Sequence, residues 1–246
     1  MGSEMQFESE ESGIFRHIHT YVLRAGRMTD AQKRAYEVHA ARWCLPFRQS
    51  ALNFAGIFGD LHPVVVEVGF GMGQATAEIA AQDPDRNYIG IEVHRPGVGR
   101  LLAEIERRSL SNVRIIEYDA LPVLESMLPD NSVAAFHVFF PDPWPKKRHH
   151  KRRLMRRPRT GLFARKLAPG GLLFMATDWQ PYAEEACAEL SATPQLVNEY
   201  DGFAPRPAWR PETAFERKGK AAGRRIFDLV FRKVCPESGG EGARGQ

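Results

Sequence analysis

From Pro63 onward, short apolar runs alternate with amphipathic stretches, and this alternation is the strongest constraint on the fold. The apolar runs have the length and the β-branched or aromatic content of buried strands. Strands and helices in alternation predict a doubly wound α/β fold with a seven-stranded, mostly parallel sheet. The predicted strands are 64–68, 87–92, 113–118, 133–140, 172–177, 195–200 and 225–232, and the predicted helices are 73–81, 95–108, 158–166 and 180–190.

The chain divides into a core and three appendages. Residues 1–12 and 236–246 lack apolar periodicity and have the composition of disordered tails. Residues 13–61 form an amino-terminal extension of helical character, in which Thr29 and Asp30 offer an N-cap to a run of good helix formers. Residues 62–235 form the α/β domain, with strand 172–177 entered through a turn at Pro169-Gly170-Gly171.

Composition limits the setting in which the chain works. It has no run of eighteen apolar residues and begins with acidic residues, which favours a cytoplasmic protein with no membrane attachment. The formal net charge is only +4, but the segment 146–166 contains eleven Lys or Arg residues and no acid. Such local charge indicates a polyanionic partner, although a solvated basic helix face is the alternative.

A glycine-rich turn joins the first predicted strand to its helix. Gly69, Gly71 and Gly73 allow a tight turn and a close approach of the backbone to a nucleotide-like ligand. The spacing differs from the dinucleotide fingerprint, in which the third glycine comes three residues after the second, so NAD is disfavoured. Glu67 stands just ahead of these glycines and suits a cofactor that carries ammonium and sulfonium charges.

The next two strands also end in acids. Glu92 can accept both hydroxyls of a ribose, and Asp119 can receive the amino group of an adenine. The alternative role of Asp119 is the N-cap of the following helix. Together with the glycine turn, these acids resemble the S-adenosyl-L-methionine sites of Rossmann-like class I methyltransferases.

The fourth strand leads into Asp142, which lies between two prolines that cannot continue a strand. Ligands of open α/β sheets bind at such strand ends. Asp178 follows the fifth strand and either binds a base or caps a helix. Trp144 and Trp179 either stack on a flipped base or pack in the core.

Two further features bear on the substrate and on metals. A long, late loop rich in Pro, Arg and Trp includes Trp209 and Arg210, and we expect it to act as a substrate lid. His149 and His150 are adjacent and have no evident third ligand, so no metal site is expected.

Several segments together are similar to the bacterial tRNA (guanine-N7-)-methyltransferase family. They are the glycine turn, 91–94, the run Phe140–His149, 177–179, 213–216 and an amino-terminal 23–27; the run Pro141–Lys147 is the most specific. The resemblance spans roughly residues 21 to 233. It implies methyl transfer from S-adenosyl-L-methionine to N7 of the guanosine at position 46, in the tRNA variable loop.

The resemblance also implies residue roles. Asp142 would be catalytic. Cofactor contacts would come from Glu67, Gly69, Gly71, Gly73, Glu92, Asp119 and Asp142. Substrate contacts would come from Lys146, Asp178, Thr213, Ala214, Phe215 and Glu216. RNA contacts would come from Arg148, His149, His150, Lys151, Arg152 and Arg153.

The chemistry of guanine explains why an acid is useful at this place. N7 is an unprotonated acceptor, so attack on a sulfonium methyl needs no strong base. Positive charge moves to the purine during transfer, and a nearby carboxylate stabilises it. Asp142 would act in this way or by holding the amino edge of the base, and the sequence leaves both roles open.

Two other functions remain compatible with the sequence. One is a non-catalytic RNA-binding protein or chaperone built on a methyltransferase-like fold, which the intact glycine turn argues against. The other is a methyltransferase acting on DNA or on an exocyclic amine. The sequence is compatible with a monomer or a homodimer.

Overall fold

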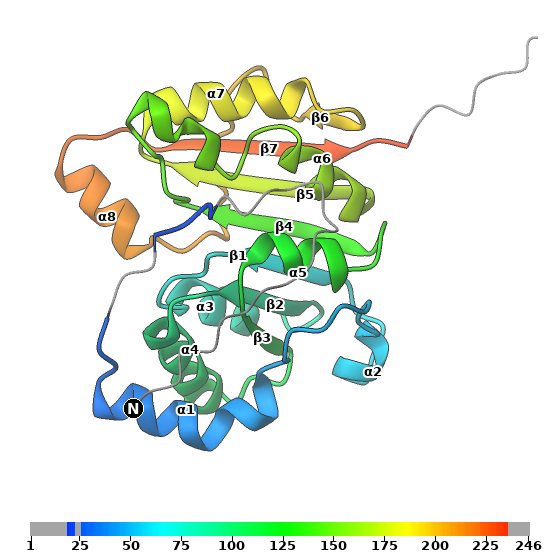
Figure 1. Cartoon of the computed structure of the whole chain (residues 1–246), viewed down its shortest axis with the longest axis vertical. Helices are drawn as coiled ribbons and strands as arrows, with labels where there is room; N and C mark the ends of the chain where they lie inside the picture. Colours follow the sequence, from blue (N-terminus) through cyan, green and yellow to red (C-terminus); the bar gives the residue numbers. More distant parts are fainter. Residues whose placement is uncertain (1–18, 23–25, 236–246) are drawn as a thin grey trace, which may run out of the picture.

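A computed structural model of the chain describes residues 19–22 and 26–235. The predicted tails, 1–12 and 236–246, lie outside the described residues. A seven-stranded sheet with the order β3-β2-β1-β4-β5-β7-β6 forms the centre of the molecule (Figure 1). The strands are β1 (Val64–Val68), β2 (Asn87–Glu92), β3 (Val113–Glu117), β4 (Val133–Phe139), β5 (Leu167–Thr177), β6 (Leu196–Asn198) and β7 (Phe227–Lys233).

Strands β1 to β5 are parallel, and β7 pairs antiparallel with both β5 and β6. The predicted doubly wound, mostly parallel sheet of seven strands is therefore confirmed. The parallel strands are the buried apolar runs that the sequence showed, and β1 is buried along its whole length.

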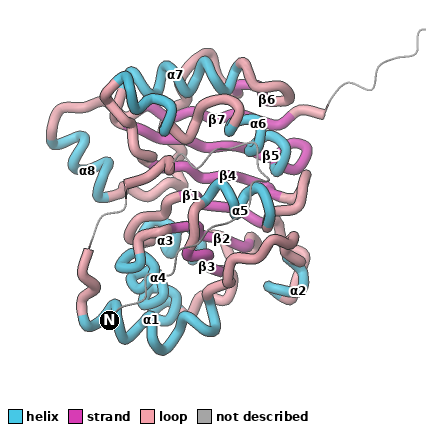
Figure 2. Tube along the Cα trace, in the orientation of Figure 1, coloured by secondary structure: helices cyan, strands magenta, loops and turns pink. Residues whose placement is uncertain are grey.

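Two layers of helices cover the sheet (Figure 2). On one face, apolar residues of α1, α3 and α4 pack against alternate residues of the strands. On the other face, α5, α6 and α7 build the larger core. The helices are α1 (Asp30–Trp43), α2 (Phe54–Phe58), α3 (Gln74–Gln82), α4 (Arg95–Arg108), α5 (Ala120–Ser126), α6 (Arg159–Lys166), α7 (Gln180–Ser191) and α8 (Ala214–Ala221), with a 3₁₀ helix η1 (Lys147–Arg152). In the part of the chain that the structure describes, no helix is long and apolar enough to span a membrane.

The helix of the amino-terminal extension begins where the sequence predicts. The Thr29 hydroxyl accepts a hydrogen bond from the Gln32 amide, and the Gln32 side chain accepts one from the Thr29 amide, which forms a capping box. Helix α1 then packs on α4 at Gly99, where an added Cβ would lie 2.6 Å from the Gln32 carbonyl oxygen. Gly99 thus permits the close packing of the extension on the core.

Two predictions about the later part of the chain need correction. Strand β5 begins at Leu167, five residues before its predicted start. The register shift between Val133 and Ala135 accommodates the Pro169-Gly170-Gly171 turn within the strand, with Gly170 at φ +77°. In addition, the late loop contains helix α8, which the sequence did not predict.

Candidate active site

The candidate residues gather at one edge of the sheet. Strands β1 to β5 run in parallel, so their carboxyl ends meet at this edge, and α8 and residues 19–22 also lie there (Figure 1). Five acids stand at or just beyond the five strand ends: Glu67, Glu92, Asp119, Asp142 and Asp178.

The glycine turn has the conformation that its composition predicts. Gly69, Gly71 and Gly73 have φ angles of +75°, +60° and +69°, a region that other residues rarely adopt. Helix α4 approaches the glycine turn closely at Gly97, where an added Cβ would lie only 1.8 Å from the carbonyl oxygen of Gly71. The two glycines of the α4 start, which weaken a helix in isolation, are therefore required by packing.

Glu67 is buried at the end of β1. Its Oε2 atom accepts a hydrogen bond of 2.8 Å from the Thr76 hydroxyl of α3. Burial raises the pKa of Glu67 to about 7, and the hydrogen bond from Thr76 only partly offsets this effect. A cationic group placed beside Glu67 would favour its ionised form.

Glu92 organises the turn from the end of β2. Its Oε2 atom accepts a hydrogen bond of 2.8 Å from the Gly71 amide, and its Oε1 atom accepts from the amides of Val93 and His94. A carboxylate offers about four acceptor positions, so these three bonds leave room for a ligand hydroxyl.

Asp119 serves as a cap and also lines a pocket. Its Oδ1 atom accepts from the Leu121 amide at 3.1 Å, which makes Asp119 the N-cap of α5. The same carboxylate lines an open pocket of about 320 Å³, and its Oδ2 atom lies 3.5 Å from Nδ1 of His19. The pocket is lined by His19, Tyr21, Val93, Glu117, Tyr118, Asp119 and Pro122.

Asp142 lies in a sharply bent loop after β4. Phe140 and Trp144, on either side of it, have positive φ angles of 55° and 45°. Oδ2 of Asp142 accepts a hydrogen bond of 3.2 Å from the Val22 amide. Trp144 is buried, and its indole N–H donates to the Thr20 carbonyl at 3.1 Å. Trp144 therefore packs the loop against residues 19–22 and does not present its ring for stacking on a base.

Asp178 faces α8. Its Oδ2 atom accepts a hydrogen bond of 2.7 Å from Nε of Arg224, and an added Cβ at Gly219 of α8 would lie 3.0 Å from the same oxygen. The N-cap of α7 is Trp179, which makes no side-chain cap bond. The alternative role of Asp178 as a helix cap is therefore wrong. Trp179 is partly buried and packs against the larger core.

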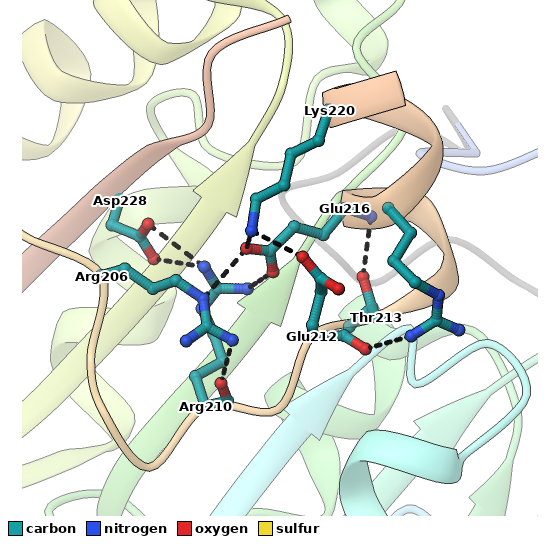
Figure 3. A network of polar contacts seen from close by, with 8 residues as sticks. Arg206, Arg210, Glu212, Thr213, Glu216, Lys220 and Asp228 are labelled. Carbon is teal, nitrogen blue, oxygen red and sulfur yellow. Dashed lines mark hydrogen bonds and ion pairs between the residues drawn. The ribbon is translucent and has the colours of Figure 1, made fainter. Parts of the chain in front are cut away.

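The segment 213–216 begins α8. Thr213 is the N-cap and accepts a hydrogen bond of 3.1 Å from the Glu216 amide. Phe215 is exposed, lies nearly parallel to the Phe140 ring at 6.5 Å, and approaches Gly71. The Glu216 side chain is fully buried in a network of ion pairs, so its carboxylate is not open to a substrate in this arrangement (Figure 3).

The basic tract is divided between surface and interior. Lys146, Lys147, Arg148 and Lys151 are exposed around η1. Arg153, one of the expected RNA contacts, is instead buried and pairs with Glu185 of α7. Arg159 and Lys166 are buried as well. Glu185 and Asp130, which lie outside the basic tract, pair with Arg153 and Lys166, so part of the positive charge of the tract is neutralised.

The remaining basic side chains of η1 are partly buried and contact neighbouring residues. The Arg152 guanidinium lies 4.8 Å from the centre of the Trp144 ring, and the His149 ring meets the same indole edge-on. Nδ1 of His150 lies 3.6 Å from Glu185. Among the residues that the structure describes, no three His, Cys, Asp or Glu side chains form a cluster that could hold a metal ion.

The fold and this edge define a Rossmann-like methyltransferase. A family model described as "Putative methyltransferase" matches residues 61–229. Among solved structures, the 16S rRNA methyltransferase KamB superposes with a TM-score of 0.56 over 74% of this chain and 93% of that one, at 16% identity, which shows the shared fold.

Curated relatives identify the family more closely. The tRNA (guanine-N(7)-)-methyltransferase of Paracidovorax citrulli is 48% identical over 218 residues, covering 89% of this chain and 88% of the relative. That of Treponema pallidum (strain Nichols) is 46% identical over 252 residues, covering 92% of this chain and 100% of the relative. The chain belongs to the tRNA (guanine-N(7)-)-methyltransferase family.

Proposed function

We propose that this protein transfers a methyl group from S-adenosyl-L-methionine to N7 of the guanosine at position 46 in the variable loop of tRNA. The observation that carries the proposal is the position of Asp142, at the sheet edge that bears the glycine turn and next to the exposed basic residues of η1. Such an enzyme would work in the cytoplasm, where its tRNA substrate is found.

The residues at this edge fit the cofactor. A buried acid with a pKa near 7 ahead of the glycine turn suits the ammonium group of the methionine moiety. Glu92 would hold a ribose hydroxyl with its remaining acceptor position, and the pocket beside Asp119 would take the adenine. The cofactor supplies an electrophilic methyl group on a sulfonium.

The acceptor base would lie between Asp142 and α8. Asp142 would accept hydrogen bonds from the amino edge of the guanine and stabilise the positive charge that develops on the purine. Phe215 offers an exposed ring beside Gly71 and Phe140 on which a flipped base can stack. Asp178 and Thr213 border the same space from β5 and α8.

Phosphates would bind along the exposed residues of η1. Lys146, Lys147, Arg148 and Lys151 supply positive charge that orients the RNA without reading its sequence. His149, His150 and Arg152 lie at the edge of this surface. Arg153 is excluded from it, because its guanidinium is buried.

The decisive experiment uses labelled S-adenosyl-L-methionine and unmodified tRNA, followed by nuclease digestion and identification of the methylated nucleoside. We expect N7-methylguanosine at one variable-loop site. Asp142→Asn should lower kcat by about 10²-fold or more, as removal of an electrostatic group does, while cofactor affinity stays within a few-fold. Asp85→Asn is the matched control, because Asp85 lies just before β2 at the opposite edge of the sheet.

The alternatives give different products. Tight tRNA binding that is indifferent to the cofactor, with no transfer, would favour a chaperone. Methyl transfer to an exocyclic amine would give a nucleoside whose glycosidic bond is stable, whereas the glycosidic bond of N7-methylguanosine is labile and can be cleaved. Turnover of Asp142→Asn at the rate of the unmodified protein would exclude the role assigned to Asp142.

A further inference from the structure

We propose that Arg210 is a positioning residue for the acceptor site, whose buried guanidinium anchors α8 to β7 and to the end of the strand that leads to Asp142. This inference rests on the proposed function and deepens it. It also gives Arg210, predicted from the sequence only to lie on a substrate lid, the role of an anchor inside the protein.

The guanidinium of Arg210 connects two carboxylates from different elements (Figure 3). Its Nη1 atom lies 2.5 Å from Oε2 of Glu216 in α8, and its Nη2 atom lies 3.1 Å from Oδ1 of Asp228 in β7. The side chains of Arg210 and Glu216 are both fully buried. A planar guanidinium can satisfy two carboxylates at once, whereas a single ammonium is a point charge.

Other cations complete the cluster around Glu216. Nε of Arg206 donates to Oε1 of Glu216 at 2.9 Å, and Arg206 also donates to the Arg210 carbonyl oxygen. Nζ of Lys220 lies 3.1 Å from Glu216 and 2.6 Å from Glu212. Burial acts to raise the pKa of Glu216, but the charge of Arg210 and the bonds from Lys220 and Arg210 outweigh it, so the pKa is lowered. Glu216 is therefore ionised and committed to this cluster.

These polar contacts are the principal attachment of α8. Within the helix only Glu216 and Gly219 are buried, so little apolar packing holds it in place. Helix α8 is nevertheless a wall of the proposed acceptor site, with Phe215 beside Gly71 and Gly219 against Asp178. A helix held chiefly by one charge cluster moves when that cluster is broken.

Arg210 also contacts the strand that leads to Asp142. Its guanidinium lies 5.6 Å from the centre of the Phe139 ring and 5.9 Å from that of Phe140, within the range of cation–π contacts. Phe140 in turn lies parallel to Phe215. One side chain thus sets the position of α8 relative to the end of β4, on either side of the space proposed for guanine.

The test uses two variants. Arg210→Lys keeps the positive charge but loses the planar guanidinium that binds two carboxylates at once, and Asp228→Asn weakens the ion pair between Arg210 and β7. Cofactor affinity, kcat and KM for tRNA, thermal unfolding and amide hydrogen exchange are measured for each. We expect cofactor Kd within threefold of the unsubstituted protein, a loss of at least tenfold in kcat/KM for tRNA, and faster exchange of the amides of α8. The effect of Asp228→Asn should be in the same direction and smaller.

Lys166→Met is the matched control, because Lys166 is another buried cation, paired with Asp130 away from the strand ends that form the site. It should lower the Tm while leaving kcat/KM within twofold. The proposal is overturned if Arg210→Lys retains kcat/KM within twofold, or if α8 exchanges at an unchanged rate. It is also overturned if Lys166→Met lowers kcat/KM as much as Arg210→Lys does when the two variants have lost the same amount of Tm. Amide hydrogen exchange in α8 does not depend on turnover, so it tests the anchoring role of Arg210 independently of the proposed function. The proposed function fails if the unsubstituted protein forms no N7-methylguanosine.

Discussion

Nε of Arg153 donates a hydrogen bond of 2.9 Å to the carbonyl oxygen of Pro143, the residue that follows Asp142. The same guanidinium pairs with Glu185 at 2.5 Å and lies over the Tyr182 ring. Arg153 therefore fixes the bent loop of Asp142 to helix α7. It belongs by sequence to the basic tract, but its contacts are those of a core residue.

Arg153→Met should destabilise the protein without weakening the electrostatic part of RNA binding. Loss of the guanidinium leaves the Glu185 carboxylate and the Pro143 carbonyl without their partner, at a cost of about 2 kcal/mol in the free energy of unfolding. Arg148→Ala, at an exposed position, should leave stability unchanged and reduce the slope of log K for tRNA against log salt by about one. Urea unfolding measures the stability of the two variants, and salt titrations measure the salt dependence of their tRNA binding. A reduced salt slope in Arg153→Met would contradict its assignment to the interior.

The division of the basic tract illustrates what the sequence leaves undetermined. Charge density predicts a phosphate-binding surface, and Lys147 and Arg148 of that segment are exposed. Nothing local in the sequence shows that Arg153 and Arg159 turn inward. The acid that pairs with Arg153, Glu185, is 32 residues away, and Arg159 donates to the main-chain carbonyls of Lys151 and Arg153, a group that every residue carries. Tertiary pairing of this kind has no local pattern.

Gly97→Ala should disable the proposed cofactor site. A Cβ at Gly97 would overlap the Gly71 carbonyl oxygen, so α4 or the glycine turn has to shift, at a cost of about 3 kcal/mol. Cofactor affinity should fall by tenfold or more, because Gly71 itself is held by Glu92. Isothermal titration and thermal unfolding measure the two effects.

Gly161→Ala is the control for that substitution. Gly161 is also helical and exposed, and a Cβ there meets no atom within 4 Å. Alanine should raise the free energy of unfolding by about 0.5 to 1 kcal/mol and leave cofactor affinity unchanged. Equal tolerance at positions 97 and 161 would show that the close approach at Gly97 does not constrain the turn.

The local elements were largely predictable, and their long-range contacts were not. The boundaries of β1, β2 and α4 match the prediction because apolar runs and periodicity specify them locally. Helix α8 was missed because half of its residues are charged, which leaves no continuous apolar face, and because it is held by Arg210, Arg206 and Lys220. Five acids at successive strand ends could be inferred from sequence, since parallel strands end at one edge.

The raised pKa of Glu67 predicts an unusual dependence of stability on pH. A carboxyl with a pKa of about 7 in the folded state and an ordinary value near 4.5 in the unfolded state binds its proton more tightly when folded. Its contribution to stability is therefore fully present below pH about 4.5 and is lost as the pH rises through 7, by about 3 kcal/mol in total. Glu67→Gln, which keeps an acceptor for Thr76, should become progressively more stable relative to the unsubstituted protein from pH 5 to pH 8. Parallel pH profiles of urea unfolding for the two proteins would refute the raised pKa.

The same group predicts proton release when the cofactor binds. At pH 6.5 more than half of Glu67 is protonated in the free protein, and an ammonium group beside it would favour the carboxylate. Binding should then release about half a proton or more, which titration calorimetry detects as a dependence of the apparent enthalpy on the ionisation enthalpy of the buffer. An α-amino group has an ordinary pKa of about 7.7 to 8.0, so the cofactor is already largely protonated at pH 6.5 and takes up little. Glu67→Gln should bind more weakly and show no such release. An equal release in both proteins would mean that the proton comes from another group and that the ammonium does not lie beside Glu67.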